Sequence, residues 1–100
     1  MLFVYVTCKN AREAEEIGVS LVKKRLASCA VVLPKAKSFF FWKGKIKKAS
    51  EALLLLKASD GKRNAIEKEI AKLHSYETPG ILFFQPKASR KFEKWVDESS

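Results

Sequence analysis

The fold is decided by residues 35–57, which read Lys-Ala-Lys-Ser-Phe-Phe-Phe-Trp-Lys-Gly-Lys-Ile-Lys-Lys-Ala-Ser-Glu-Ala-Leu-Leu-Leu-Leu-Lys. Successive residues of a β-strand point to opposite faces, so the aromatic run from Phe39 to Trp42 puts Phe39 and Phe41 on one face and the other two rings on the opposite face. The leucines at 53–56 repeat this pattern on the expected return strand. Because a small antiparallel sheet normally leaves one face in water, two apolar faces indicate that further copies of the chain cover one of them.

The length of this hairpin supports the same interpretation. Lys43-Gly44 is the predicted turn, with the glycine supplying a positive φ. Each arm would hold about 14 residues and extend roughly 45 Å. A compact domain of this size has a diameter of about 34 Å, so the tip should project beyond it. A long apolar arm left bare would aggregate, and we therefore predict an obligate homo-oligomer with sites between subunits.

Local patterns outside the hairpin predict an α+β domain with a short terminal helix. Asn10 is expected to cap the first helix, with Glu13 completing a capping box, while Pro34 bends the second strand. The expected elements are a strand at 2–7, a helix at 11–27, strands at 29–42 and 45–57, a helix capped by Asp60 or Ser59 and closed by His74, a strand at 81–84, and a helix capped by Ser89 that buries Phe92, Trp95 and Val96. This β-α-β-β-α-β order is the ferredoxin-like arrangement, in one domain over residues 1–100.

Composition limits the class of protein. The 100 residues carry a net charge of +9, from 20 Lys and Arg against 11 Asp and Glu. No apolar run approaches the roughly 20 residues that span a bilayer, so no membrane partner is expected. Two cysteines are too few for a disulfide framework, and the first residues read as a strand rather than a signal peptide. We therefore expect a cytosolic protein.

Several segments resemble the CutA family, the divalent-cation tolerance proteins, with consistent spacing over essentially the whole chain. They are residues 24–30 (Lys-Arg-Leu-Ala-Ser-Cys-Ala), residues 41–46 (Phe-Trp-Lys-Gly-Lys-Ile) followed by Glu51 and 55–57, residues 74–79 (His-Ser-Tyr-Glu-Thr-Pro), and the pair Phe92 and Trp95. The resemblance implies a ferredoxin-like subunit, a homotrimer built through the long hairpin, and a link to metal-ion tolerance. It also implies a trimer architecture like that of PII signalling proteins.

The candidate metal ligands are Cys8, Cys29 and His74. Thiolate and imidazole suit copper or zinc, and we predict Cu²⁺ bound through His74 and Cys8. The chain has no CxxC or HxxxH pair, so a site must combine distant groups. A structural alternative is that Cys29 is a small buried hydrophobe, whereas Cys8, at a strand end, is accessible. His74 has its own alternative, as a hydrogen-bonded residue that holds the following turn.

A second group of candidates would line inter-subunit clefts or support assembly. They are Trp42, Lys45, Glu51, Lys57, Tyr76 and Trp95. Their alternative role is structural, with buried rings and an interface ion pair between Glu51 and Lys57.

The runner-up function is a PII-like trimer that binds an anionic ligand or nucleic acid through its basic surface. The RNP1 pattern of sheet-based RNA binders is missing, which argues against nucleic acid. No nucleophile–base pair stands out either, and the segment at 7–12 lacks a glycine for a phosphate cradle. We therefore expect no enzymatic activity.

Overall fold

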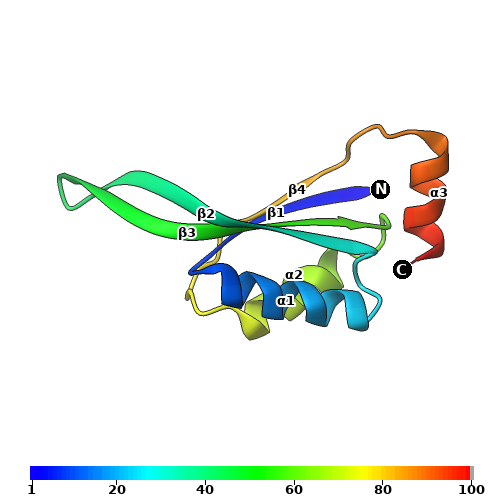
Figure 1. Cartoon of the computed structure of the whole chain (residues 1–100), viewed down its shortest axis with the longest axis horizontal. Coiled ribbons are helices and arrows are strands. Elements are labelled where there is room, and N and C mark those ends of the chain that lie inside the picture. Colours follow the sequence, from blue (N-terminus) through cyan, green and yellow to red (C-terminus); the bar gives the residue numbers. More distant parts are fainter. Residues whose placement is uncertain (100) are drawn as a thin grey trace.

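The computed structural model of the chain describes residues 1–99 and confirms the expected order of elements. The strands form a four-stranded antiparallel sheet in the order β2-β3-β1-β4. Figure 1 shows α1 and α2 lying against the same face of this sheet. The elements are β1 (Leu2–Cys8), α1 (Ala11–Lys23), β2 (Cys29–Trp42), β3 (Lys45–Ala58), α2 (Arg63–Leu73), β4 (Ile81–Phe84) and α3 (Arg90–Glu98).

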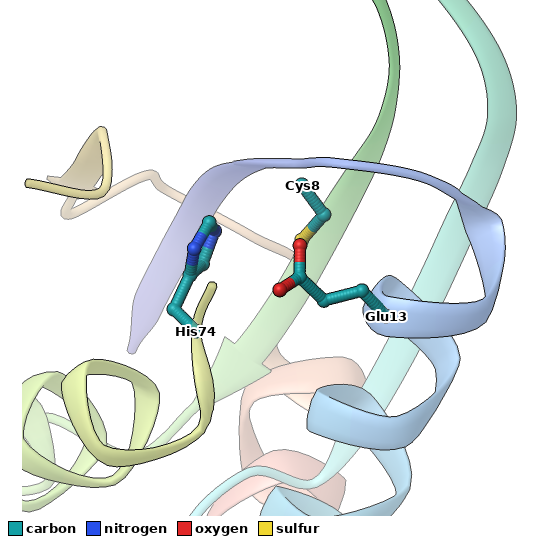
Figure 2. Close-up of side chains that lie close together, drawn as sticks. All are labelled: Cys8, Glu13 and His74. Atoms are coloured by element: carbon teal, nitrogen blue, oxygen red, sulfur yellow. The ribbon is translucent and has the colours of Figure 1, made fainter. Parts of the chain in front are cut away.

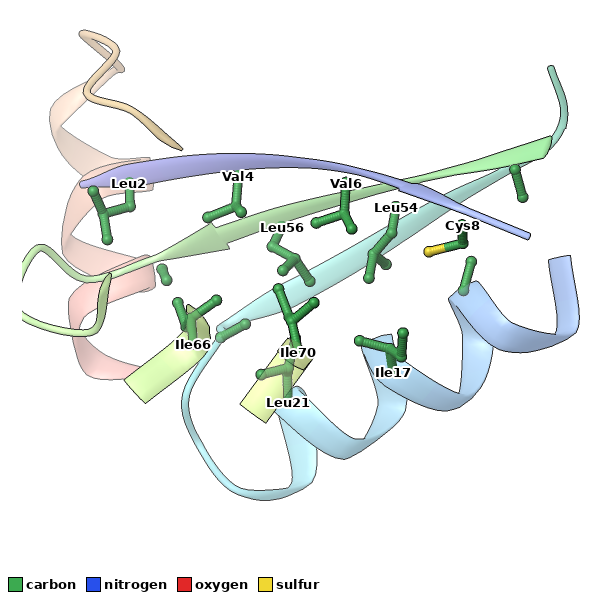
Figure 3. Packing of buried hydrophobic residues seen from close by; sticks show 14 residues of the cluster. Leu2, Val4, Val6, Cys8, Ile17, Leu21, Leu54, Leu56, Ile66 and Ile70 are labelled. Atoms are coloured by element: carbon green, nitrogen blue, oxygen red, sulfur yellow. The ribbon is translucent and has the colours of Figure 1, made fainter. Parts of the chain in front are cut away.

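The core lies between the sheet and the two helices, as Figure 3 shows. Every second residue of β1 is buried, and the buried positions of β3 follow the same two-residue period. The helices contribute residues at helical spacing, including Ile17 and Leu21 from α1 and Ile66 and Ile70 from α2. At Gly18 a Cβ atom would lie 3.0 Å from both Ala30 Cβ and Leu54 Cδ1, so this glycine lets α1 approach the sheet closely.

Neither α1 nor α2 covers the opposite face of the sheet, which is rich in apolar side chains. Val31 and Leu33 of β2 are 38% and 45% exposed, and Leu82 and Phe84 of β4 are 52% and 49% exposed. In register, Val31 lies opposite Leu55 and Leu33 opposite Leu53, so these two leucines of β3 continue this surface. The expectation of two apolar faces is confirmed.

The β2–β3 hairpin makes the molecule elongated, with extents of 46 × 25 × 22 Å. Both arms have 14 residues, and the turn holds Lys43 at φ 51° and Gly44 at φ 76°. The pairing is irregular between Leu33 and Ala36, where Pro34 was expected to bend the strand. Figure 1 shows the tip extending well beyond the helices.

Three local expectations were wrong. Helix α1 ends at Lys23 rather than at residue 27, because Arg25 adopts a left-handed φ of 57°. Helix α2 follows Lys62 with no side-chain cap, since Asp60 accepts a hydrogen bond from the Met1 amino group instead. In α3 only Val96 is buried, and Trp95 stays 46% exposed. Within residues 1–99 no helix is long and apolar enough to cross a membrane.

Candidate metal centre

Three potential metal ligands meet where β1, α1 and the end of α2 come together. They are Cys8, Glu13 and His74, all buried, and one ligand atom from each lies within 4.8 Å of the others. Figure 2 shows the three side chains pointing toward one another from separate elements. The site therefore joins residues that are up to 66 positions apart in sequence, from 8 to 74.

The start of α1 fixes Glu13 in this group. The Asn10 side chain accepts the backbone N–H of Glu13 at 2.9 Å, as a helix cap should. The Glu13 carboxylate does not complete a capping box. It accepts the backbone N–H groups of Lys9 at 2.8 Å and Ser75 at 2.7 Å, and so ties the start of α1 to the segment after α2.

Glu13 is held as a carboxylate. Burial acts to raise the pKa of Glu13, but the hydrogen bonds from Ser75 and Lys9 outweigh it and keep the pKa below its ordinary value. The site thus contains a negative charge at neutral pH that two backbone donors already satisfy.

His74 follows the last turn of α2, and both of its ring nitrogens have backbone partners. Nε2 lies 2.8 Å from the carbonyl oxygen of Thr7, and Nδ1 lies 3.0 Å from the backbone nitrogen of Tyr76. A carbonyl can only accept and a backbone N–H can only donate. Neutral His74 therefore carries its proton on Nε2 and presents the lone pair of Nδ1 to Tyr76.

Cys8 is the last residue of β1 and is fully buried. Burial first, and then the charges of Glu13 and Glu51, raise the pKa of the Cys8 thiol to about 12. At neutral pH Cys8 is a thiol rather than a thiolate. Coordination of an ion by this sulfur would release its proton.

A second layer of hydrogen bonds lies beside the cluster. The Tyr76 hydroxyl donates to Glu51 Oε2 at 2.7 Å, and Ser38 donates to the other carboxylate oxygen of Glu51. The Tyr76 ring packs against the ring of His74, with centroids 4.8 Å apart. Burial, followed by the Glu51 hydrogen bond, raises the pKa of Tyr76 to about 12, so its hydroxyl remains a donor.

The three ligands predicted from the sequence lie at two separate positions in the structure. Cys8 and His74 come together, but Cys29 lies near the other end of the sheet. Cys8 pairs with Ala52 and Cys29 with Lys57, which are about 16 Å apart along β3. The predicted exposures are also reversed, since Cys8 is buried and Cys29 is partly exposed. The reason is that β1 turns its even-numbered residues toward the helices.

Glu13 was missed as a ligand because its sequence position already had a role, as the third residue of a capping box. Only the approach of the segment after α2 brings Ser75 and His74 to this carboxylate.

The cleft candidates are also divided. Glu51 and Tyr76 hydrogen-bond to each other next to the metal cluster. The Glu51 carboxylate is bound by Tyr76 and Ser38, and no ion pair between Glu51 and Lys57 is present within the described residues 1–99. The remaining candidates lie elsewhere: Trp42 and Lys45 face each other at the hairpin tip, Lys57 lies opposite Phe3 and Cys29, and Trp95 stacks on Phe92 in α3.

Comparison with known proteins identifies the family. The family model for the CutA1 divalent ion tolerance protein matches residues 2–99. The chain is 37% identical over 98 residues to the divalent-cation tolerance protein CutA of Archaeoglobus fulgidus, covering 97% of this chain and 95% of that protein. It is 33% identical over 95 residues to the CutA homolog of Xenopus laevis, covering 94% of this chain and 63% of that protein.

A solved structure supports the same assignment. It is described as the periplasmic divalent cation tolerance protein CutA from Archaeoglobus fulgidus and is 36% identical to this chain. The two folds agree with a TM-score of 0.92 over 99% of this chain and 98% of that chain. The chain therefore belongs to the CutA1 divalent ion tolerance family.

Proposed function

We propose that this chain is a non-enzymatic, homotrimeric ion-tolerance protein that binds Cu²⁺ through Cys8, Glu13 and His74. The observation that carries the proposal is the convergence of these three side chains, with ligand atoms within 4.8 Å of one another. The family description names ion tolerance and no reaction, which favours a binding role over catalysis.

The donor set fits a soft or borderline transition metal. A thiolate, an imidazole and a carboxylate together suit copper or zinc better than Mg²⁺ or Ca²⁺. Ligand atoms at about 2.0–2.3 Å from such an ion lie at most about 4.6 Å from each other. The separations within the cluster are therefore close to those that coordination needs, and small shifts of these side chains complete the site.

Ligand exchange at this site has a definite cost. The Cys8 thiol loses a proton, Glu13 gives up part of its bonding to two backbone N–H groups, and His74 releases one of its two backbone partners. The bound ion is expected to replace these hydrogen bonds and to hold the ends of β1 and α2 together. The expected role is ion storage or sensing, rather than a rigid structural site.

Calorimetry with Cu²⁺ tests the site directly. Cys8→Ser and His74→Ala are each expected to weaken binding by about tenfold or more, because the first replaces a sulfur ligand by a weakly binding hydroxyl and the second removes the imidazole. Cys29→Ser is the matched control, since it makes the same chemical change in β2, away from the cluster. Equal affinities for wild type, Cys8→Ser and His74→Ala would reject the site.

The proposed trimer is supported by the shape and surface of the subunit. The hairpin tip projects with Phe39, Phe41 and Trp42 between 54% and 75% exposed. The sheet face opposite the helices is apolar as well. We expect other copies of this chain to cover the hairpin tip and this sheet face, since the projecting arms can extend to a neighbouring subunit.

We place the protein in a reducing compartment, the cytosol. The support is that Cys8 and Cys29 are both free thiols and lie too far apart to pair. The Archaeoglobus fulgidus relative is described as periplasmic, so fractionation of cells that express this chain decides the point.

A second candidate function is the binding of an anionic ligand, favoured by a cavity of about 380 Å³ at the base of the hairpin. Lys9, Lys35 and Lys37 line it, and none of the three forms an ion pair within the described residues 1–99. The net charge of +9 points to the same class of ligand.

Heparin chromatography tests the anionic alternative. The double change Lys35→Glu and Lys37→Glu is expected to lower the salt concentration of elution, whereas Lys87→Glu with Lys91→Glu changes net charge equally on an exposed surface outside the cavity. Equal elution of the two double variants would attribute retention to overall charge alone.

A further inference from the structure

We propose that Tyr76 is a positioning residue that opposes ion uptake at His74 and couples the occupied site to the base of the hairpin arm. This inference rests on the proposed ion-binding function. It concerns how the same site opens, and it assigns to Tyr76 and Glu51 a role in setting ion affinity.

In its neutral form the His74 ring has one nitrogen that can bind a metal ion without a change of tautomer. Nδ1 holds the free lone pair, and the backbone N–H of Tyr76 occupies it at 3.0 Å. A metal ion binds a ring nitrogen through its lone pair. His74 can therefore offer Nδ1 as it stands only when the Tyr76 N–H withdraws.

The two ring nitrogens of His74 differ in how firmly their backbone partners are held. Use of Nε2 would require a change of tautomer and loss of the bond to Thr7. Thr7 lies inside β1, where the sheet pairs it with Leu53. Tyr76 lies in the irregular segment between α2 and β4, outside any helix or strand. The Tyr76 N–H is easier to displace from the ring than the Thr7 carbonyl, because fewer backbone hydrogen bonds of a helix or strand hold it in place.

The side chain of Tyr76 is held in place by the base of the hairpin arm. Its hydroxyl donates to the Glu51 carboxylate at 2.7 Å, and Glu51 also accepts from Ser38 of the facing strand. Glu51 and Ser38 belong to β3 and β2 at the base of the projecting arm. Withdrawal of Tyr76 from His74 therefore strains a chain of bonds that ends across the hairpin.

Thermodynamic linkage predicts the direction in which loss of the Tyr76 contact changes the ion affinity. A contact that stabilises the closed form and is lost on ion binding lowers the apparent ion affinity. Removal of the Tyr76 hydroxyl should then tighten ion binding even though it removes a hydrogen bond from the folded protein. In return, ion binding should loosen the contacts at the base of the arm.

The test measures Cu²⁺ affinity of Tyr76→Phe by calorimetry together with thermal stability in the absence of metal. We expect affinity to rise about tenfold, on the scale of one hydrogen bond to a charged acceptor, while the melting temperature falls. Tyr5→Phe is the matched control, because Tyr5 lies on the opposite face of the sheet from Cys8 and should bind as wild type does. A purely structural role for Tyr76 would lower stability without raising affinity.

Hydrogen exchange of the wild type supplies the second measurement. Added Cu²⁺ should speed exchange at the Tyr76 amide and at amides near Ser38 and Glu51, and leave the Leu54–Leu56 amides of the sheet centre unchanged. Unchanged or weaker binding by Tyr76→Phe, with wild type still binding through Cys8, would overturn the coupling alone. Absence of Cu²⁺ binding by the wild type would overturn the proposed function and the coupling together.

Discussion

Trp42→Asp is expected to convert the proposed homotrimer into folded monomers. The Trp42 side chain is 54% exposed in the single subunit, near the tip of an arm that extends away from the core. Burying this exposed half against another copy stabilises the assembly by roughly 3 kcal/mol per subunit, at about 25 cal/mol/Å² for a side chain of roughly 250 Å². An unpaired carboxylate in the same apolar contact costs several kcal/mol more.

Light scattering after size-exclusion chromatography measures the subunit number, and circular dichroism checks that the monomer is folded. Val19→Asp is the matched control, because Val19 is 53% exposed on α1, outside the hairpin and the bare sheet face. We expect Val19→Asp to keep the size of the wild type. A Trp42→Asp protein of unchanged size, or a wild type that is monomeric, would contradict assembly through the arms.

Glu13→Ala is expected to destabilise the protein by about 3 kcal/mol at neutral pH. The substitution removes a charged acceptor from two backbone donors, Lys9 and Ser75, and each such hydrogen bond contributes about 1.5–3 kcal/mol. Chemical denaturation at a fixed protein concentration measures the loss. Glu16→Ala is the control on the same helix, since its pair with Arg12 is exposed and should contribute less than about 1 kcal/mol.

The pH dependence of stability distinguishes the contribution of the Glu13 charge from that of its side-chain packing. The folded-state pKa of Glu13 lies below its ordinary value, so its contribution is complete above the unfolded pKa near 4.3 and is lost as pH falls through the lowered folded value. The stability gap between wild type and Glu13→Ala should therefore narrow between neutral pH and about pH 3. A gap of constant size over that range would assign the effect to packing alone.

Sequence patterns predicted the order of the elements and the projecting hairpin, because these depend on local periodicity and turn chemistry. Alternation along two strands predicted that the aromatic and leucine runs make both faces of the sheet apolar, and the length of the arms predicted a projecting hairpin. The turn at Lys43-Gly44 followed from the preference of glycine for positive φ. The order of helices and strands followed from their hydrophobic periods, and with it the fold class.

The same patterns left some local details undecided. The first strand is apolar at most positions, so alternation alone gave no reason to turn Cys8 inward rather than outward. The end of α1 depended on a left-handed Arg25, a residue type that gives no warning of that conformation. The cap of α2 was mispredicted because Asp60 pairs with the amino group of Met1, a residue distant in sequence, instead of capping the helix.

The chain sequence by itself determined the hairpin, its exposed apolar surfaces and two of the three candidate donors, Cys8 and His74, because strand alternation, turn chemistry and side-chain type can be read without knowing the packing. Only the tertiary structure decided which donors meet. It joined Glu13 to Cys8 and His74, set Cys29 apart, and occupied both nitrogens of the imidazole with backbone partners. These contacts depend on how the segment after α2 passes the end of β1, and packing between distant segments has no period that a sequence can display.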